Sequence, residues 1–301
     1  MTTRQTASLR GERLLNEPLA RYTTWRVGGP ARQLYRPADG EDLLQFLASL
    51  PEGEPLLWLG LGSNLLIRDG GFNGTVIATQ GRLDGMALIS ATALRVEAGV
   101  SCAQVARFAA RQGLCGVEFL TGIPGTFGGA LAMNAGAFGG ETWSQVTTVE
   151  TVDRAGQLHK RLPTEFKVGY RQVERPAEEW FLAATLALEP GDVTESQGRI
   201  RELLERRNSS QPIGQPSCGS VFRNPPGGHA ARLIEAAGLK GVLIGGAQVS
   251  EKHANFIINR GNATAADIEA LIRRVRERVK AASGVELVTE VHIVGETEER
   301  A

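Results

Sequence analysis

The stretch from Thr121 to Glu141 restricts what this chain can fold into more than any other segment. It reads TGIPGTFGGALAMNAGAFGGE, in which seven glycines alternate with large apolar residues. Glycine permits positive φ and lets backbone N–H groups approach an anion closely, while Phe127, Leu131 and Met133 attach the segment to a core. A flexible connector would carry serine, threonine and charge in these places. The pattern therefore predicts a buried loop shaped around a ligand, and a pyrophosphate cradle in particular.

Composition describes an ordinary globular protein that is long enough for two domains. The chain has 301 residues, of which 42% are hydrophobic, so it can bury a sizeable core. Its 33 basic residues balance its 33 acidic ones, and no overall field attracts a nucleic acid or a membrane surface. We expect neither of these partners and see no sign of an obligate protein partner.

Cysteine and histidine spacing argues against disulfides and metals. Cys102, Cys115 and Cys218 are odd in number and lack C-x-x-C spacing, and the four histidines show no H-E-x-x-H pattern. The N-terminus has no continuous apolar segment, and no apolar run is long enough to span a bilayer. We therefore expect a cytoplasmic protein with free thiols and no metal.

The first part of the chain predicts many short strands with few helices between them, which is typical of an α+β fold. Residues 1–20 suggest only a short docking segment. Strands are expected at 23–27, 56–59, 75–78, 94–98, 147–152 and 181–188, and helices at 39–50 and 101–111. The second of these helices begins with a capping-box pattern, Ser101 with Gln104.

A change of composition at 189–192 predicts the main domain boundary. We expect a cofactor domain at 1–190, made of two subdomains that divide near 51–55, and a smaller α+β domain at 191–301. Thr194 should cap a helix there. Further helices are expected at 229–237 and 264–282, strands at 246–249, 255–258 and 286–294, and a frayed end from residue 296.

A second glycine loop follows the expected strand at 56–59. Gly60 and Gly62 begin a G-x-G, but Leu65 stands where the dinucleotide-binding fingerprint requires its third glycine. This is evidence against an ordinary Rossmann fold. Ser63 and Asn64 follow directly and offer side-chain hydrogen bonds beside free backbone amides.

Three polar residues are candidates for chemistry, and each has a plainer interpretation. Ser220 lies in a Gly-Ser turn without the G-x-S-x-G frame of a hydrolase and could be a turn hydroxyl. Arg171 follows Gly-Tyr and could clamp a carboxylate or lie on the surface. Glu290 lies in the expected last strand, where cover on both faces would raise its pKa, although an exposed glutamate is equally compatible with the pattern.

Seven motifs in fixed order resemble one known family. They are TWRVGGPA, GLGSNLLIRDGGFNGTVI, GIPGTFGGALAMNAGAFGGE, GYR, GSVFRNP, SEKHANFIIN and VTEVHIVG. Together, from about residue 21 to 295, they resemble the UDP-N-acetylenolpyruvoylglucosamine reductases, flavoenzymes of peptidoglycan precursor synthesis. The resemblance implies an FAD-binding domain of the vanillyl-alcohol-oxidase type, followed by a smaller α+β substrate-binding domain.

The resemblance also implies where the cofactor binds. The glycine loops would hold FAD with their backbone amides on its pyrophosphate. Because we see no histidine or cysteine in these loops, we expect FAD to be bound non-covalently, with NADPH as the reductant. The cofactor contacts implied are Thr24, Gly60, Gly62, Ser63, Asn64, Gly122, Ile123, Pro124, Gly125, Gly128, Gly129, Asn134 and Gly136.

In this family the flavin passes a hydride to the enolpyruvyl double bond of a UDP-sugar. Position in the matching motifs implies that Arg171 and Glu290 stabilise the resulting enolate and that Ser220 delivers a proton. The segment between 181 and 217 lacks the longer, tyrosine-bearing insertion of one branch, which leaves open what covers the substrate. Substrate contacts would be Tyr170, Arg223, Asn224, Gln248 and Lys252.

Two other functions are compatible with parts of this pattern. An FAD-dependent oxidase or dehydrogenase on the same fold would share the glycine loops but should lack GSVFRNP and the terminal glutamate. A non-catalytic nucleotide-binding module would keep the loops without the combination of Arg171, Ser220 and Glu290. Yellow colour and substrate-dependent consumption of NADPH would separate the three.

Overall fold

A mixed four-stranded sheet begins the fold in the computed structural model, which describes residues 9–298. Its order is β1-β2-β5-β3, with β1 antiparallel to β2 and the other pairs parallel. The helix between β2 and β3 starts where Asp39 accepts a hydrogen bond from the N–H of Asp42. The elements are β1 (Glu12–Pro18), β2 (Pro30–Arg36), α1 (Gly40–Ser49), β3 (Leu56–Leu59) and β5 (Phe72–Ala78).

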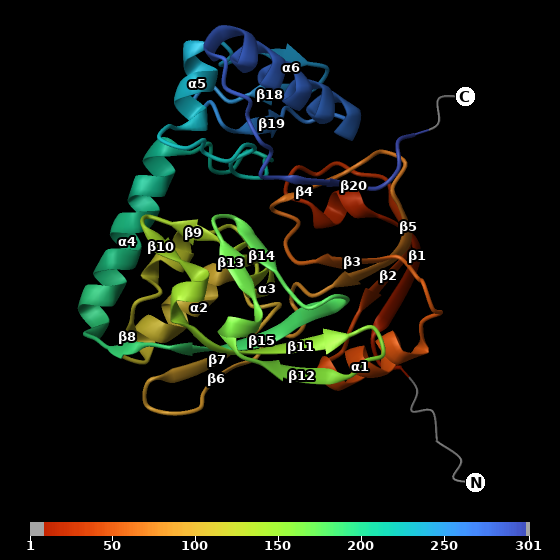
Figure 1. The fold of residues 1–301 in the computed structure, drawn as a ribbon, viewed down its shortest axis with the longest axis vertical. Helices are drawn as coiled ribbons and strands as arrows, with labels where there is room; N and C mark the ends of the chain where they lie inside the picture. Colours follow the sequence, from red (N-terminus) through yellow and green to blue (C-terminus); the bar gives the residue numbers. More distant parts are fainter. Residues whose placement is uncertain (1–8, 299–301) are drawn as a thin grey trace.

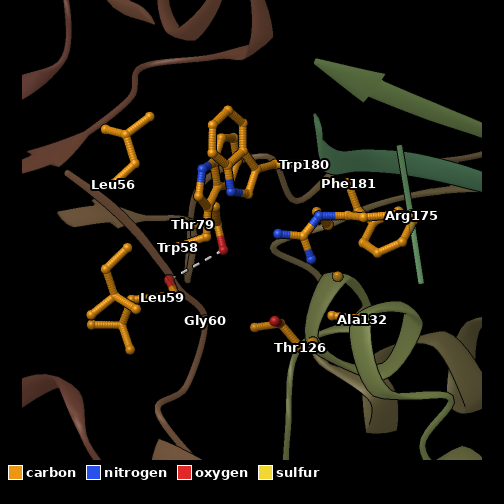
Figure 2. Close-up of a pocket in the computed structure, with 14 residues that line it drawn as sticks. Leu56, Trp58, Leu59, Gly60, Thr79, Thr126, Ala132, Arg175, Trp180 and Phe181 are labelled. Atoms are coloured by element: carbon orange, nitrogen blue, oxygen red, sulfur yellow. Dashed lines mark hydrogen bonds between the residues drawn. The ribbon is translucent and has the colours of Figure 1, made fainter. Parts of the chain in front are cut away.

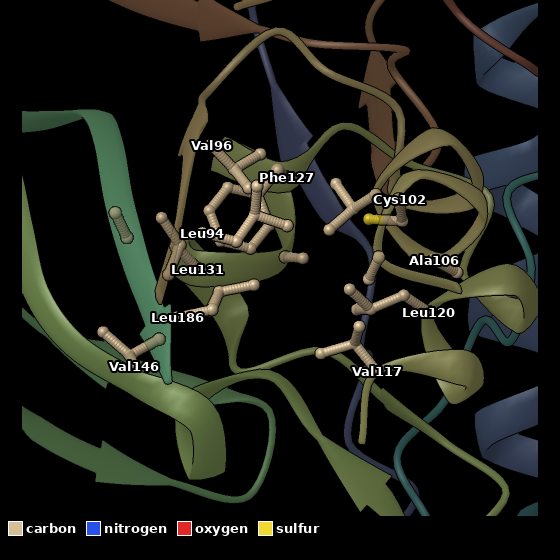
Figure 3. Packing of buried hydrophobic residues seen from close by; sticks show 14 of the residues in the cluster. Leu94, Val96, Cys102, Ala106, Val117, Leu120, Phe127, Leu131, Val146 and Leu186 are labelled. Carbon is tan, nitrogen blue, oxygen red and sulfur yellow. The ribbon is translucent and has the colours of Figure 1, made fainter. Parts of the chain in front are cut away.

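An antiparallel five-stranded sheet, of order β12-β11-β15-β7-β6, forms the second layer. Figure 3 shows Leu94 and Val96 of β7 packing against Phe127 and Leu131 of a short helix. This packing fixes the glycine-rich stretch to the sheet. The elements are β6 (Met86–Leu88), β7 (Ala93–Glu97), α2 (Cys102–Arg111), α3 (Phe127–Met133), β11 (Val146–Asp153), β12 (Leu158–Arg161) and β15 (Glu179–Ala187).

A third region lies above the other two in Figure 1, and the long helix α4 leads up to it along the left edge of the molecule. Three short antiparallel strands pack there beside two helices. The last strand, β20, leaves this region and pairs in parallel with β4 near the N-terminus. The elements are β4 (Leu65–Ile67), α4 (Val193–Ser210), α5 (Ala230–Ala236), β17 (Leu243–Ile244), β18 (Ala247–Val249), β19 (Ile257–Asn259), α6 (Ala265–Ser283) and β20 (His292–Val294).

Short elements connect these layers and form small hairpins. One of them, β13 with β14, projects beside α3 and is important for the site. The short strands are β8 (Leu114–Cys115), β9 (Gly136–Ala137), β10 (Gly140–Glu141), β13 (Lys167–Gly169), β14 (Gln172–Glu174) and β16 (Glu189–Pro190). Single 3-10 turns are η1 (Leu19–Tyr22), η2 (Glu118–Gly122), η3 (Thr142–Gln145) and η4 (Pro163–Glu165).

Most expected helices and strands are present, and the α+β fold is confirmed, but the N-terminal prediction is wrong. Residues 12–18 form β1, and no strand covers 23–27; residues 1–8 of the expected docking segment lie outside the described residues. Trp25 is fully buried and donates through Nε1 to the carbonyl of Ile257 at 2.7 Å, while Arg26 has a φ of 58°. A distant core contact therefore bends this segment away from the extended conformation that its β-branched residues favour.

The prediction of one long last strand over 286–294 is also wrong, because the backbone of residues 286–291 pairs with other segments than the backbone of 292–294. Thr289 forms an isolated bridge with Phe222, and the N–H of Glu290 donates to Val221, before β20 pairs with β4. Glu296 pairs with Gly71 where fraying was expected, and 299–301 lie outside the described residues. The cap of α4 is Asp192 and not Thr194.

The domain limits at 190 and near 51–55 stay predictions. Ile200 of α4 belongs to the same buried cluster as Leu94, so this helix packs on the second sheet. Trp25 and Leu66 belong to the buried cluster of Ile268 in the third region. The change from the first sheet to the second comes after β5. Within residues 9–298, no helix is long and apolar enough to cross a membrane.

Candidate active site

Arg171, Ser220 and Glu290, which are far apart in sequence, line one pocket of about 240 Å³, here called the reactive pocket. They come from the β13–β14 hairpin, the GSVFRNP segment and the residues before β20. The glycine-rich stretch and the loop after β3 complete the wall. Their lining residues include Ser63, Asn64, Gly122, Ile123, Pro124 and Gly136.

Arg171 is held at the tip of its hairpin by backbone carbonyls. Strands β13 and β14 are joined by the two residues Tyr170 and Arg171, and Arg171 has a φ of 56°, a conformation that favours glycine. Its Nη2 donates to the carbonyl of Gly136 at 2.7 Å, and Nη1 donates to that of Asn134 at 3.4 Å. These bonds tie the guanidinium to the glycine-rich stretch, so an unfavourable backbone conformation is kept at the site.

Arg171 and Glu290 form an ionic contact inside the reactive pocket. Nε of Arg171 lies 3.4 Å from Oε1 of Glu290, and the carboxylate side chain is only 12% exposed. The Nε–H is buried and makes no aligned hydrogen bond within residues 9–298. Burial raises the pKa of Glu290, and the positive charges of Arg171 and Arg223 oppose this rise.

The backbone of Glu290 is fixed by the loop expected to bind the cofactor. Nδ2 of Asn64 donates to the carbonyl of Glu290 at 3.2 Å, and the N–H of His292 donates to the carbonyl of Asn64 at 3.0 Å. On the other side, the N–H of Glu290 donates to Val221 at 2.8 Å. Asn64 therefore connects the cofactor loop directly to the catalytic candidate.

Ser220 follows a glycine turn and is half-buried in the reactive pocket. Gly219 has a φ of 66°, which turns the chain so that Cys218 points away from solvent. Burial raises the pKa of the Cys218 thiol to about 12. The thiol lies 3.3 Å from Oγ1 of Thr24 and donates to the carbonyl of Gly62 at 3.4 Å. Thr24 thus supports the glycine loop from behind and lines neither this pocket nor the two cavities described next.

A second cavity, the middle cavity, adjoins the reactive pocket and fits a pyrophosphate. It is about 180 Å³ and shares Ser63 and Asn64 with the reactive pocket; Gly60, Gly62, Gly125 and Gly129 also line it. A Cβ on Gly60 would overlap Oγ1 of Thr126. The backbone of Gly60 therefore lies directly against the side chain of Thr126, and the absence of a side chain on Gly60 leaves room and amide donors for an anion.

Asn134 is the one glycine-stretch candidate that lies behind the wall. Its side chain accepts from the N–H of Trp143 at 3.2 Å and donates to Glu141 at 3.0 Å and to the carbonyl of Gly169 at 3.2 Å. It therefore joins the stretch to the hairpin that carries Arg171. Gly128 lines a third cavity, described below.

None of the five expected substrate residues lines the reactive pocket. Tyr170 is half exposed, with the Arg171 guanidinium 5.4 Å from its ring centre. Gln248 is buried between Arg260 and Gly241, and Lys252 donates to the carbonyl of Asn208 at 2.6 Å. None of these three residues forms part of the pocket's surface.

The other two expected substrate residues come from the GSVFRNP segment. The Nε of Arg223 is buried without a partner within residues 9–298. Oδ1 of Asn224 accepts from the N–H of Ala230 at the start of α5, at 3.1 Å. The substrate roles of all five residues stay predictions.

Sequence reasoning missed several lining residues. Phe138, Gln211 and Phe256 line the reactive pocket, and only Phe138 belongs to a stretch that its glycine pattern had marked. It also missed Cys218 in the reactive pocket and His292 in the middle cavity, because we expected neither a cysteine nor a histidine near the cofactor. The placement of these two residues depends on the path of 218–222 and β20, which no local pattern indicates.

A third cavity lies beyond the middle one and is also absent from the sequence-based prediction. This tryptophan cavity is about 250 Å³ and is lined by Trp58, Thr79, Thr126, Arg175, Trp180 and Phe181, among others. Figure 2 shows these side chains around the space. Three expected cofactor contacts, Gly60, Gly128 and Gly129, also line it, and Trp58, which closely precedes Gly60, was a further signal in the sequence.

Comparison with known proteins gives the class that this arrangement defines. Residues 31–161 match a family model described as an FAD binding domain. The solved structure of 6-hydroxy-D-nicotine oxidase from Arthrobacter nicotinovorans superposes with a TM-score of 0.56 over 96% of this chain and 90% of its own, at 13% identity, which shows a shared fold. The class is an FAD-dependent oxidoreductase of the vanillyl-alcohol-oxidase type.

The particular family follows from closer relatives. Residues 211–294 match the model of the UDP-N-acetylenolpyruvoylglucosamine reductase C-terminal domain. The reductase of Alkalilimnicola ehrlichii is 65% identical over 94% of both chains, and the solved MurB of Thermus caldophilus is 36% identical, covers 95% of this chain and 99% of its own, and has a TM-score of 0.81. The chain belongs to the UDP-N-acetylenolpyruvoylglucosamine reductase family, which confirms the resemblance and FAD as cofactor.

Proposed function

We propose that the chain reduces the enolpyruvyl group of UDP-N-acetylglucosamine enolpyruvate to UDP-N-acetylmuramate, with NADPH as reductant, through Arg171, Glu290 and Ser220. One observation supports these roles above all. Three side chains from separate parts of the sequence meet in a single pocket that adjoins the glycine loops. FAD, when bound, takes a hydride from NADPH and supplies it to the substrate.

Arg171 and Glu290 stabilise the charge that hydride addition creates. Addition at the terminal carbon spreads negative charge onto the substrate carboxylate, so donors must already face it. The buried Nε–H of Arg171, which makes no aligned hydrogen bond within residues 9–298, is such a donor. Glu290 keeps its proton to a higher pH because it is buried, and in that form its hydroxyl is a second donor.

Ser220 delivers the proton to the neighbouring carbon. Serine is a weak acid, so its alkoxide needs positive charge close by after the transfer. Arg223, three residues further on, lowers the pKa of Glu290 through its charge, and its buried Nε–H has no hydrogen-bond partner in residues 9–298. Its charge therefore reaches the same pocket and supports the proton transfer.

FAD binding is non-covalent in this proposal, although two residues capable of attachment lie near the cavities. The Cys218 thiol is protonated up to a pKa of about 12 and already donates to backbone carbonyls, so it is a poor nucleophile. Acid denaturation should release all of the flavin into the supernatant. Flavin that stays with the precipitate would contradict this.

Ser220→Ala tests the proton-donor role. We expect the variant to keep bound FAD and its reduction by NADPH, measured by bleaching of the flavin absorbance, but to lose turnover with the enolpyruvyl substrate. Ser209→Ala, in the exposed last turn of α4, is the matched control. Wild-type turnover in Ser220→Ala would show that another group donates the proton, and oxygen consumption without the substrate would favour an oxidase.

A further inference from the structure

The tryptophan cavity continues the cofactor groove beyond the middle cavity. The two cavities share Trp58, Gly60, Thr126 and Gly129. The middle cavity in turn shares Ser63 and Asn64 with the reactive pocket. The three spaces therefore form one groove, with the reactive residues at one end and the tryptophans at the other.

The order of these spaces corresponds to the parts of a flavin dinucleotide. The reacting ring must lie at the end that holds Ser220 and Glu290, and the glycine backbones in the middle suit the pyrophosphate. The remaining part is the AMP half, which carries a purine. Aromatic walls suit such a flat ring, and the Trp58 and Trp180 rings lie 5.6 Å apart at an angle of 14°.

Two polar groups at this end lack protein partners among the described residues. Nε1 of Trp58 is buried without a hydrogen bond among residues 9–298. Arg175 forms no salt bridge in that part of the chain, and Figure 2 shows its guanidinium reaching into the space between Trp180 and Thr126. Arg154, also beside Trp180, is different because it is paired with Glu178 at 2.7 Å.

Arg175 is delivered to this cavity by the hairpin that also carries Arg171. Arg171 is at the tip, and Arg175 follows the end of β14, four residues later. The hairpin packs against α3, and Thr126, Gly128 and Gly129 at the start of that helix line the groove between the two arginines. One short segment thus reaches both ends of the groove.

We propose that the tryptophan cavity receives the AMP half of FAD and that Arg175 is the positioning residue that retains it. This rests on the proposed function only in that FAD occupies the groove. A planar guanidinium supplies a cation to the phosphate side and a flat face to the purine. FMN lacks the AMP half and therefore gains nothing from Arg175.

The test compares the affinities of FAD and FMN for apoprotein prepared from the full-length holoenzyme, measured by quenching of flavin fluorescence. Loss of one desolvated cation–aromatic contact corresponds to about a tenfold change in dissociation constant. We expect Arg175→Ala to weaken FAD about tenfold, to leave FMN unchanged within roughly twofold, and to weaken competition by ADP. Arg175→Lys should give an intermediate loss. Arg199→Ala, at an exposed ion pair on α4, should change nothing.

Equal weakening of FAD and FMN would overturn the proposal, because Arg175 would then support the groove as a whole. Unchanged FAD affinity would overturn it as well. Thermal unfolding of each apoprotein shows whether a variant is misfolded. If Arg175→Ala is misfolded, the FAD and FMN affinities of Arg175→Lys decide. If wild-type apoprotein binds neither flavin, the proposed function fails. If wild-type apoprotein binds FAD tightly and both Arg175 variants bind it equally well, only this inference is refuted.

Discussion

The two sides of the reactive pocket are built in different ways. The cofactor side, residues 60–64 and 122–136, presents mainly backbone, and its glycines pass so close to other chain segments that a Cβ on Gly60 or Gly136 would collide. The third-region side presents side chains, and two of these, Cys218 and Glu290, already contact the carbonyl of Gly62 and the guanidinium of Arg171. A glycine pattern predicts close backbone approach directly, whereas a polar side chain acquires its role from neighbours that the sequence does not reveal.

Arg171 is tied to the cofactor side by its bonds to Asn134 and Gly136, although its proposed role is towards the substrate. Its loss should have the largest effect. We expect Arg171→Ala to lower kcat by about 10²–10³, the usual result of removing one donor to a developing oxyanion. Reduction of FAD by NADPH should be retained, as stopped-flow absorbance can measure. Arg171→Lys should recover little, because a lysine cannot make the paired bonds to Asn134 and Gly136. Near-normal kcat in the alanine variant would move charge stabilisation to the opposite side.

Gly60→Ala tests whether the cofactor side is as intolerant as its packing indicates. The new methyl group would overlap Thr126 and push apart the two loops of the middle cavity. We expect FAD binding to become weaker by about 1–3 kcal/mol, which is the usual cost of an extra methyl group in a closely packed place. Titration of the apoprotein with FAD measures this. Gly198→Ala in α4, where a Cβ meets only the end of Arg201, is the control.

Glu290→Gln should change how stability depends on pH. The folded-state pKa of Glu290 is raised above its ordinary value of 4.5. The contribution of the protonated carboxyl to the free energy of unfolding is therefore fully present below pH 4.5 and is lost as pH rises through the raised pKa. The difference in unfolding free energy between wild type and variant should therefore fall between pH 4.5 and the raised pKa, by about 1.4 kcal/mol for each pH unit in that interval. Urea denaturation at several pH values measures it. A difference independent of pH would contradict the assignment.

Asn224→Asp separates two roles on the third-region side. Oδ1 already accepts from Ala230, and the amide Nδ2–H groups make no hydrogen bond within residues 9–298. The aspartate keeps the acceptor and removes the donor. We expect KM for the enolpyruvyl substrate to rise about fivefold, as loss of one hydrogen bond of about 1 kcal/mol implies, with the melting temperature almost unchanged. A fall in stability without any change in KM would limit Asn224 to its structural role.

The sequence allowed much of the fold and the three catalytic candidates to be predicted, because local signals were strong. The capping box at Ser101 and the apolar spacing of α1 and α6 depend on residues a few positions apart. Arg171, Ser220 and Glu290 stand in motifs whose order was specific to a family. Their convergence in one pocket agrees with that interpretation.

Other features depend on contacts between distant residues and could not be predicted. Trp25 leaves the expected strand because its indole bonds to Ile257, in a different region of the chain. Arg175 does not belong to any of the seven motifs, and only the path of the hairpin brings it beside Trp58 and Trp180. Cys218 reached the reactive pocket through a turn at Gly219, which gave no cysteine-specific signal.

The parallel pairing of β20 with β4 determines when the site can exist. In the part of the chain that the structure describes, strand β4 pairs with no strand other than β20. Asn64 beside it binds the backbone of a glutamate that is 226 positions further along the chain. On a ribosome, both loops expected to contact FAD are complete long before that glutamate has been translated. The parts proposed for cofactor binding and for reaction are thus separated in time of synthesis, because an unfinished chain already holds these loops but has no Glu290.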